Sequence, residues 1–525
     1  MKKTILTSAS IIALGMAAPA LAQSTSTVDQ LGNANTALVG QTGASSSDID
    51  QNGDNNKADI TQSGSGNSSV VDQDAFNALA DVTQEGERNS STIDQDDPDS
   101  APGQGGTTGI AGFDPDATVD QNGNDNSSTI NQTIAAGGGF NQTANVNQDG
   151  DFNISTIDQN SDGPGYTGGL SARVTQTGDA DSSITQTGSN GGKNMRANVT
   201  QDNSTSTVIQ SASDTSGFNP SANAVVNQMG GSTSDVFQTL TGDMTGDLYA
   251  NVRQDNGAYS RVEQNAYGAG SNNADAVVTQ NGDVDSFITQ TFDNAGANTF
   301  TATVTQTGTD LTSTITQDDK APLSQADANL SATVLQSGMG STSLIDQDNK
   351  AATAMVNQSG FDNDSTILQD GAGLSADVLQ SGSNNLSFVS QIGGLNSSVD
   401  VDQLGDNSFS YVNQDSNARN DTATVRQLAG SVNNTSRIDQ NGATPSAQSF
   451  STATVEQGGS DSLSEITQTG LTNTALVTQM GVDTESFITQ DGIGNSATVM
   501  QSGNGHVSTI DQNGNANAAT VTQGN

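Results

Sequence analysis

The chain has 525 residues, of which 31% are hydrophobic and 4% aromatic, and its formal net charge is −44 at pH 7. So polar a chain cannot bury a thick globular core, and its acidic charge would repel a nucleic-acid backbone, so we expect no nucleic-acid partner. The sequence contains no cysteine, which excludes disulfides, thiolate metal sites and cysteine nucleophiles.

Residues 1–22 are predicted to be a secretory signal peptide. Lys2 and Lys3 precede an apolar run from Ile5 to Ala18, and Ala20-Leu21-Ala22 supplies small residues before a cleavage site ahead of Gln23. The run is too short for a membrane anchor, and no later segment reaches the roughly 18 apolar residues that a spanning helix needs. We therefore expect an exported protein with no membrane span.

From residue 23 to residue 525 the sequence repeats a short motif that ends in glutamine. Forty such glutamines occur, and 20 of the 39 intervals between them are 11 residues long. Val or Ile stands two residues before each of them. The residue four before is Ser in every second unit and Ala in the others, with Val399 as the exception. We call these units serine strands and alanine strands.

Residues at i, i+2 and i+4 lie on one face of a β-strand, so each motif predicts a strand whose Ser or Ala, Val or Ile, and Gln point inward. If strands stack in register, the buried glutamines bond to one another in columns, because an unpaired buried amide costs about 1–3 kcal/mol. The predicted amide ladder includes Gln30, Gln41, Gln51, Gln62, Gln73, Gln84, Gln358, Gln369, Gln490, Gln501, Gln512 and Gln523. The predicted inward core includes Ala37, Val39, Ser47, Ile49, Ala58, Ile60, Ser69 and Val71.

The two kinds of turn differ in length. Steps from an alanine strand to the next serine strand are all 9 to 13 residues, whereas all ten intervals of 15 or more fall on the other step. The longest excursion is an extended loop at about residues 96–114. Glycine suits the short turns because it accepts positive φ without strain. The predicted arc residues are Gly32, Asn35, Gly53, Asn56, Gly64, Asn67, Gly514 and Asn517.

Together these patterns predict an all-β fold over residues 23–525. It is a β-solenoid with two strands per rung and about 20 stacked rungs, in which parallel, in-register strands form two facing sheets.

The repeat resembles that of the curlin family, S-x5-Q-x-G-x2-N-x-A-x3-Q. Every position is matched from Ser24 to Gln41 and again from Ser45 to Gln62, and the segment from Gln512 to Gln523 matches the second half. The middle units lose the Gly or Asn and gain loops. The resemblance implies an extracellular functional amyloid of the biofilm matrix, a dedicated outer-membrane export pore and a nucleator subunit.

The function we predict is that of a secreted, non-enzymatic structural protein. It would assemble with itself, head to tail, into fimbrium-like fibres at the cell surface, for adhesion and biofilm scaffolding. One alternative is a monomeric secreted β-solenoid that binds a ligand, ice or a surface glycan through one face. Another is an exported disordered polymer.

We expect no catalytic, cofactor or metal site. The single histidine, His506, stands where Asn495 and Asn517 stand in neighbouring units, so we interpret it as an asparagine substitute. Asp48 and Asp50 are outward, solubilising charges under this prediction.

Three further surface features carry weaker hypotheses. The run Asp96-Asp97-Pro98-Asp99 is interpreted as a polar loop rather than a calcium site. Outward Thr-x-Thr pairs, which ice binding needs in arrays, occur in only three of 40 strands: Thr303/Thr305, Thr314/Thr316 and Thr520/Thr522. Outward Phe287, Phe388 and Phe487 are candidate sites of apolar contact between fibres.

Overall fold

The computed structural model describes residues 23–97, 115–134, 138–162, 165–189, 194–213, 221–241, 246–267, 271–292, 297–319, 329–415, 418–442 and 449–524. The predicted signal peptide and residues 98–114 of the predicted extended loop lie outside these ranges. Each gap after residue 97 falls between a serine strand and the following alanine strand, or at the end of the chain.

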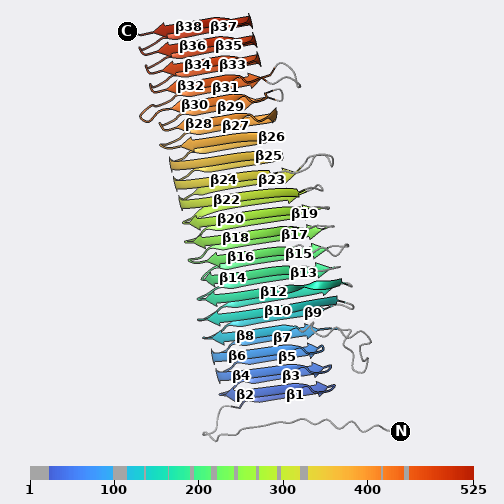
Figure 1. Cartoon of the computed structure of the whole chain (residues 1–525). Helices are drawn as coiled ribbons and strands as arrows, with labels where there is room; N and C mark the ends of the chain where they lie inside the picture. The colour runs from blue at the N-terminus through green and yellow to red at the C-terminus, as the bar shows by residue number, and fades with distance from the viewer. Residues whose placement is uncertain are drawn as a thin grey trace, which may run out of the picture. The chain divides into compact units, whose positions relative to one another are not determined.

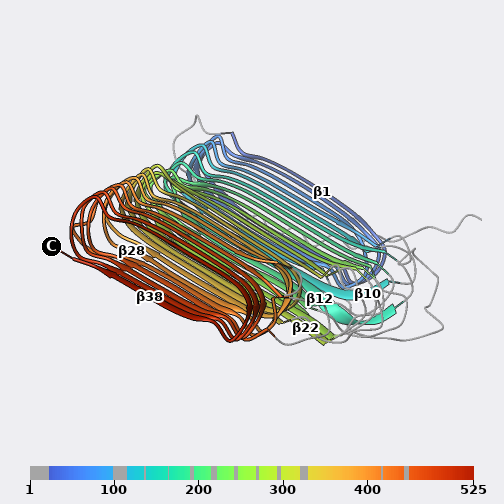
Figure 2. The same cartoon turned by 90° about the horizontal axis from the view of Figure 1, so that it is seen from above.

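All the regular elements in the described residues are β-strands, and the chain divides into two compact units between Val252 and Arg253. Within each unit the strands stack in pairs in chain order (Figure 1). Seen from above, the pairs of the first unit lie over one another, so that their turns form rows (Figure 2). No helix capable of crossing a membrane occurs in the part of the chain that the structure describes.

The first unit contains the following strands. Its serine strands are β1 (Thr25–Leu31), β3 (Ser46–Asn52), β5 (Ser68–Asp74), β7 (Ser90–Asp96), β9 (Ser127–Ile134), β11 (Ile154–Asp162), β13 (Asp181–Ser189), β15 (Thr205–Ser213) and β17 (Thr233–Thr241). Its alanine strands are β2 (Thr36–Thr42), β4 (Lys57–Ser65), β6 (Leu79–Glu87), β8 (Asp116–Asn122), β10 (Gly138–Asp149), β12 (Gly165–Thr177), β14 (Asn194–Asp202) and β16 (Ser221–Gln228). The boundary between the units falls within β18 (Asp247–Asp255).

The second unit repeats the scheme. Its serine strands are β19 (Tyr259–Tyr267), β21 (Val284–Phe292), β23 (Leu311–Asp319), β27 (Leu386–Leu395), β29 (Phe409–Gln414), β31 (Thr435–Asn441), β33 (Leu463–Leu471), β35 (Glu485–Ile493) and β37 (Val507–Asn515). Its alanine strands are β20 (Ser271–Asn281), β22 (Ala297–Thr309), β24 (Asn329–Met339), β28 (Ser398–Gln403), β30 (Thr422–Gln427), β32 (Thr452–Gln457), β34 (Thr474–Gln479), β36 (Ser496–Gln501) and β38 (Ala518–Gln523). Two strands, β25 (Thr342–Phe361) and β26 (Asp364–Gln380), each contain a serine motif and an alanine motif.

Strands of one kind pair in parallel with the next strand of the same kind. Val28 of β1 pairs with Ile49 of β3, and Ile49 pairs with Val71 of β5, so identical motif positions stand in register. The alanine strands follow the same rule, with Ile60 of β4 paired with Val82 of β6. The predicted fold class, an all-β solenoid of parallel strands, is confirmed.

The predicted number of separate strands was too high. The described residues form 38 strands rather than 40, and the count of two-strand rungs falls slightly below the predicted 20, because β25 and β26 continue through the turn between their two motifs. Both strands pair with each other on either side of that turn, from Thr342↔Asp364 to Gln358↔Gln380.

The core of the middle rungs is wider than the motif predicts. Phe292, two residues after Gln290, and Phe300, six residues before Gln306, are both fully buried, and their rings stack with centroids 4.1 Å apart. Such positions continue the inward alternation beyond the five-residue motif, which lengthens β21 and β22 relative to the first strands of the chain.

Candidate functional site: the amide columns and their ends

Buried glutamines bond to one another along each ladder of strands. Gln51 is fully buried; its Oε1 accepts from Gln30 Nε2 at 2.6 Å, and its Nε2 donates to Gln73 Oε1 at 2.8 Å. Gln62 in the alanine ladder accepts from Gln41 and donates to Gln84, both at 2.7 Å. The other predicted members donate in the same way: Gln73 to Gln95, Gln84 to Gln121, Gln358 to Gln380, Gln369 to Gln391, Gln490 to Gln512, and Gln501 to Gln523.

Apart from Gln30, each of these amides also bonds to the facing ladder. Gln51 Nε2 donates to the backbone carbonyl of Thr36 at 3.1 Å, and Gln62 Nε2 donates to that of Ser46 at 3.0 Å. A carbonyl only accepts, so this contact fixes which end of the amide is the NH₂ group. The glutamines therefore join neighbouring rungs and also hold the two sheets together.

The predicted inward residues occupy the space between the sheets. Ile49, Ala58, Ile60, Ser47, Ser69 and Val71 are buried, whereas Ala37 and Val39 of β2 are half-buried. The hydroxyls of Ser47 and Ser69 are buried without a hydrogen-bond partner, and the same holds for inward serines in many later strands. Serine at this position therefore costs stability relative to alanine, which sequence reasoning did not anticipate.

Three of the four predicted arc glycines lie where no side chain fits. Gly64 has φ of 107°, and a Cβ added to it would lie 1.8 Å from the carbonyl oxygen of Gly86 in the next rung. Gly32 and Gly53 are in the same situation, with a backbone oxygen 1.7 and 2.0 Å from the added Cβ. Gly514 has φ of 111°, but only the Asn517 side chain lies near it.

Asparagines close the arcs and connect them from rung to rung. Asn67 Nδ2 donates to the carbonyls of Ser63 (2.9 Å) and Gly86 (3.0 Å), and its Oδ1 accepts from the backbone N–H of Asn89 (3.0 Å). The remaining predicted arc asparagines take part in equivalent bonds: Asn35 donates to Gly53 O and accepts from Asn56 N, Asn56 accepts from Ala78 N, and Asn517 N donates to Asn495 Oδ1.

A second left-handed residue in many arcs was missed by sequence reasoning. It lies four residues after the glutamine, with φ of 57° at Ala34, 58° at Arg88, 63° at Phe152 and 54° at Thr472. In many other arcs the residue at this position is Asn or Asp, such as Asn55, Asn77 and Asp125, and these types adopt positive φ more readily than most. That preference was the sequence signal for the position.

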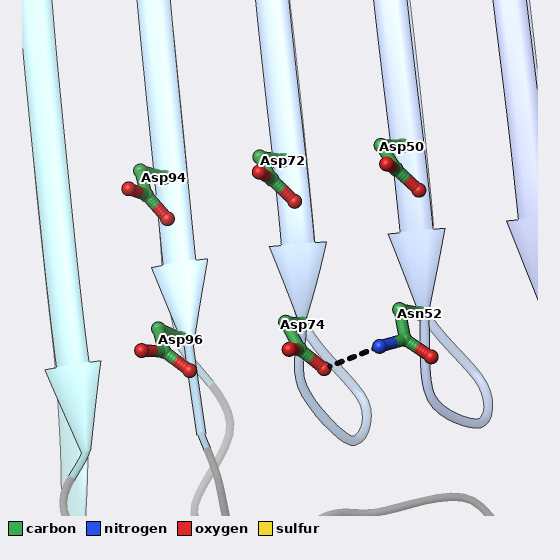
Figure 3. Close-up of a pocket in the computed structure, with 6 residues that line it drawn as sticks. All are labelled: Asp50, Asn52, Asp72, Asp74, Asp94 and Asp96. Atoms are coloured by element: carbon green, nitrogen blue, oxygen red, sulfur yellow. Dashed lines mark hydrogen bonds between the residues drawn. The ribbon is translucent and has the colours of Figure 1, made fainter.

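Carboxylates stand in rows on the outer face of the first serine strands. Asp50, Asp72 and Asp94 occupy one row across β3, β5 and β7, and Asn52, Asp74 and Asp96 occupy the next (Figure 3). The six line a shallow depression of about 370 Å³, and Asn52 Nδ2 donates to Asp74 Oδ1 at 2.9 Å. The predicted outward placement of Asp48 and Asp50 agrees with their exposure.

The rows perturb one another electrostatically. Partial burial, followed by repulsion from Asp94, Asp50, Asp74 and Asp96, raises the pKa of Asp72. Partial burial and the neighbouring carboxylates Asp29, Asp48 and Asp74 likewise raise the pKa of Asp50. In-register stacking of these carboxylates therefore disfavours their ionised form on this face.

No group of three or more acidic or histidine side chains in the described ranges is placed to hold a metal ion. His506 occupies the asparagine position before β37, and its Nε2 is buried without a hydrogen-bond partner. The run from Asp96 to Asp99 is described only as far as Asp97.

Two of the three outward phenylalanines belong to aromatic pairs. Phe388 stacks on Tyr411 with ring centroids 5.4 Å apart, and the Arg437 guanidinium lies 5.0 Å from the centre of the Tyr411 ring. Phe287 lies 5.8 Å from Tyr259. Phe487 pairs in register with Glu465 and Thr509, so it has no aromatic neighbour in its own column.

The first and last strands leave their inner faces partly open. In the described residues the register of β1 is with β3 and that of β38 is with β36. Val28 of β1 is 41% exposed, whereas its column neighbour Ile49 is fully buried. Val521 of β38 is half-buried, so both ends of the ladders present unfilled columns.

These features define a structural repeat protein, a parallel β-solenoid whose rungs are joined by columns of side-chain amides. The curlin associated repeat matches residues 44–74, 360–393, 374–405, 472–503 and 492–524. Curlin associated repeats therefore occur near both ends of the described chain and in its second unit, and they are similar to the repeats of the curlin family. A search of the curated proteins finds no match to the chain.

Proposed function

We propose that this protein is an extracellular structural subunit that assembles with copies of itself, end to end, into amyloid-type fibres. The observation that carries the proposal is that the buried columns reach both end strands without being closed. The inward side chains of β3 are covered by neighbouring rungs, whereas those of β1 are partly exposed to solvent, with Val28 41% exposed. A rung from a second copy of the chain would cover them.

A contact between unlike ends that never closes on itself yields a filament. Stacking β1–β2 of one copy on β37–β38 of another keeps serine strand on serine strand and alanine strand on alanine strand. The partner of this protein is thus a second copy of the chain, and the assembly continues the parallel register seen within each unit.

The cellular role follows from the repeats. Curlin repeats support a structural rather than an enzymatic protein, and they support an extracellular or cell-surface location. We propose that the fibres serve surface adhesion and biofilm scaffolding, with residues 1–22 directing export, an outer-membrane pore releasing the chain and a nucleator starting growth.

Electron microscopy of purified residues 23–525 after incubation tests the proposal. We expect unbranched fibres, a loss of monomer from solution and a shorter lag when preformed fibres are added. Particles that stay monomeric with β-rich circular dichroism would instead support a ligand-binding solenoid. Antibody labelling of intact cells then shows whether the fibres lie outside them.

A further inference from the structure

The amide columns have a direction. In most rungs of both units the glutamine Nε2 donates to Oε1 of the glutamine in the next rung toward the C-terminus, as Gln51 does to Gln73 and Gln490 does to Gln512. The Gln201 amide is an exception, because its contacts with Asp181 and Ser206 are satisfied only when its oxygen and nitrogen are exchanged. From Gln41 onward most of the amides also donate to a backbone carbonyl of the facing ladder, as Gln490 does to Thr474, whereas in the described residues Gln30 bonds only to Gln51. The facing carbonyl prevents the amide from turning over, so the direction is imposed by the fold.

The end strands therefore carry opposite hydrogen-bonding groups. Gln512 accepts from Gln490 and Gln523 accepts from Gln501, and each gives one N–H to a facing carbonyl, of Ser496 and Val507 respectively. One N–H of each amide is left pointing out of the last rung. We call β37–β38 the donor edge.

At the other end the pattern is reversed. Gln30 and Gln41 donate to Gln51 and Gln62, and in the described residues no group donates to their own Oε1 atoms. The β1–β2 edge thus presents two acceptors in the columns where β37–β38 presents two donors. We call it the acceptor edge.

The arcs match as well. Within the second unit Asn495 Nδ2 donates to the carbonyl of Gly514 at 2.9 Å. Asn517 is the equivalent asparagine of the last rung, and within the described chain its Nδ2 donates to no glycine carbonyl of a further rung. Gly32 is the glycine of the first rung that corresponds to Gly514. A second copy would present the Gly32 carbonyl to Asn517.

We propose that copies join in one polarity only, with the donor edge of one copy, Gln512 and Gln523, bonded to the acceptor edge of the next, Gln30 and Gln41. Two donor edges offer no glutamine acceptor to each other, and two acceptor edges offer no donor. The inference rests on the proposed function, and it adds that the two ends of a fibre are chemically different and are blocked by different substitutions.

Paired substitutions by glutamate separate donor from acceptor. Gln512→Glu with Gln523→Glu keeps the oxygens that accept from Gln490 and Gln501 but removes both outward donors, together with the N–H groups that bond the carbonyls of Ser496 and Val507. Gln30→Glu with Gln41→Glu keeps the outward oxygens, although it gives up the bonds to Gln51 and Gln62. A protease-resistant core of wild-type mass shows that each variant is folded.

The readout is two-colour imaging of single wild-type fibres to which a variant is added. The donor-edge variant docks through its intact β1–β2 edge and then slows growth at that fibre end by about tenfold or more, while the other end keeps growing. The acceptor-edge glutamate variant leaves growth at both ends within about twofold. Gln30→Met with Gln41→Met removes the acceptors. This variant docks through its intact β37–β38 edge and stops growth at the opposite fibre end, the one that the donor-edge variant leaves active.

Acidification supplies an independent measurement. Below the usual glutamate pKa of about 4.3 the new side chains at positions 512 and 523 are protonated, and each regains one O–H donor, which is shared between the facing carbonyl and the next copy, so growth at the blocked end should resume in part. Gln512→Met with Gln523→Met stays blocked at every pH. If the donor-edge variant stops both ends or neither, or if the two glutamate variants behave alike, the polarity is wrong. Absence of wild-type fibres would instead overturn the proposed function, and with it the proposed contact between the donor and acceptor edges.

Discussion

Gln369 Nε2 lies 2.8 Å from Gln391 Oε1, and the same nitrogen lies 3.1 Å from the carbonyl oxygen of Thr353 on the facing ladder. Gln369 Oε1 in turn accepts from Gln347 at 2.8 Å. One buried amide thus links three rungs and both sheets, so its removal leaves unpaired groups on every side.

Gln369→Ala should lower the free energy of unfolding by about 3 kcal/mol, since three hydrogen bonds are lost and buried donors and acceptors are left unpaired. Thr366 points outward from the same strand, and Thr366→Ala should change stability by less than about 0.5 kcal/mol. Chemical denaturation of both variants makes the comparison. Equal losses would contradict the assignment of glutamine to the core.

Gly64→Ala should destabilise the first unit by at least about 3 kcal/mol, because the residue has positive φ and an added Cβ would lie 1.8 Å from the Gly86 carbonyl oxygen. Gly40 is the matched control: nothing lies within 4 Å of an added Cβ, and its backbone lies outside the left-handed region. Thermal melts should show a large loss for Gly64→Ala and none for Gly40→Ala. A tolerated Gly64→Ala would mean that the arc is not closed as described.

Thr472→Asn should stabilise the second unit by about 1 kcal/mol. Thr472 is β-branched and exposed, yet it has φ of 54°, a conformation that asparagine adopts at lower cost. Asn384 and Asn407 already occupy the equivalent position of other arcs. The same substitution at Thr474, an exposed strand residue, should be slightly destabilising, and a gain at both sites would point to a cause other than backbone strain.

Stability of the first unit should fall as the pH rises through the aspartate range. Burial and neighbouring carboxylates raise the folded-state pKa of Asp72, so the folded chain binds that proton more tightly than the unfolded chain. The contribution is therefore present below the ordinary aspartate pKa of about 3.9 and is lost as the pH rises through the raised value.

Asp72→Asn should then raise the melting temperature at pH 7 and leave it unchanged at pH 3. Asp158 is the control, because it stands on the same outer face with the uncharged neighbours Asn131 and Thr185 in register. Asp158→Asn should have no such pH-dependent effect. If both variants show the same pH profile, stacking of carboxylates is not its source.

Asp421→Asn should stabilise the second unit at neutral pH by about 1–2 kcal/mol. Asp421 is buried at a position where later rungs carry Asn473, Asn495 and Asn517, and its Oδ2 has no hydrogen-bond partner. Burial raises its pKa, although bonds from Ser449 and Ser451 lower it. The gain should shrink toward pH 3, where the carboxyl is protonated in both states, and Asp511→Asn on the exposed face of β37 should show none.

The strands could be predicted because inward and outward side chains alternate along the sequence. Ser69, Val71 and Gln73 occupy every second position, so one face of β5 follows from the sequence once the period is seen, and equal spacing of later units predicts the parallel register. The wider core of the middle rungs was also within reach, since Ile288, Gln290 and Phe292 continue the same alternation past the motif.

Other features depend on backbone geometry that several residue types can adopt. Ala351 bends with φ of 44° inside β25, where no glycine marks a turn, so the continuity of β25 could not be anticipated. The unpartnered hydroxyls of Ser47 and Ser69 depend on which acceptors the facing strand brings near. The direction of the amide columns depends on carbonyls of that same facing strand.

One-way amide bonding has an electrical consequence. Backbone amides of neighbouring residues in a sheet point in alternating directions and largely cancel, whereas the carboxamides of Gln30, Gln51 and Gln73 all point the same way along the stacking axis. An amide group carries a dipole of about 3.5 D, so each unit gains a permanent moment that grows with its number of rungs. Copies joined in one polarity would add their moments, and such fibres should align in a weak electric field as permanent rather than induced dipoles. Their electric birefringence should then fall and recover while the fibres turn over after the field is reversed.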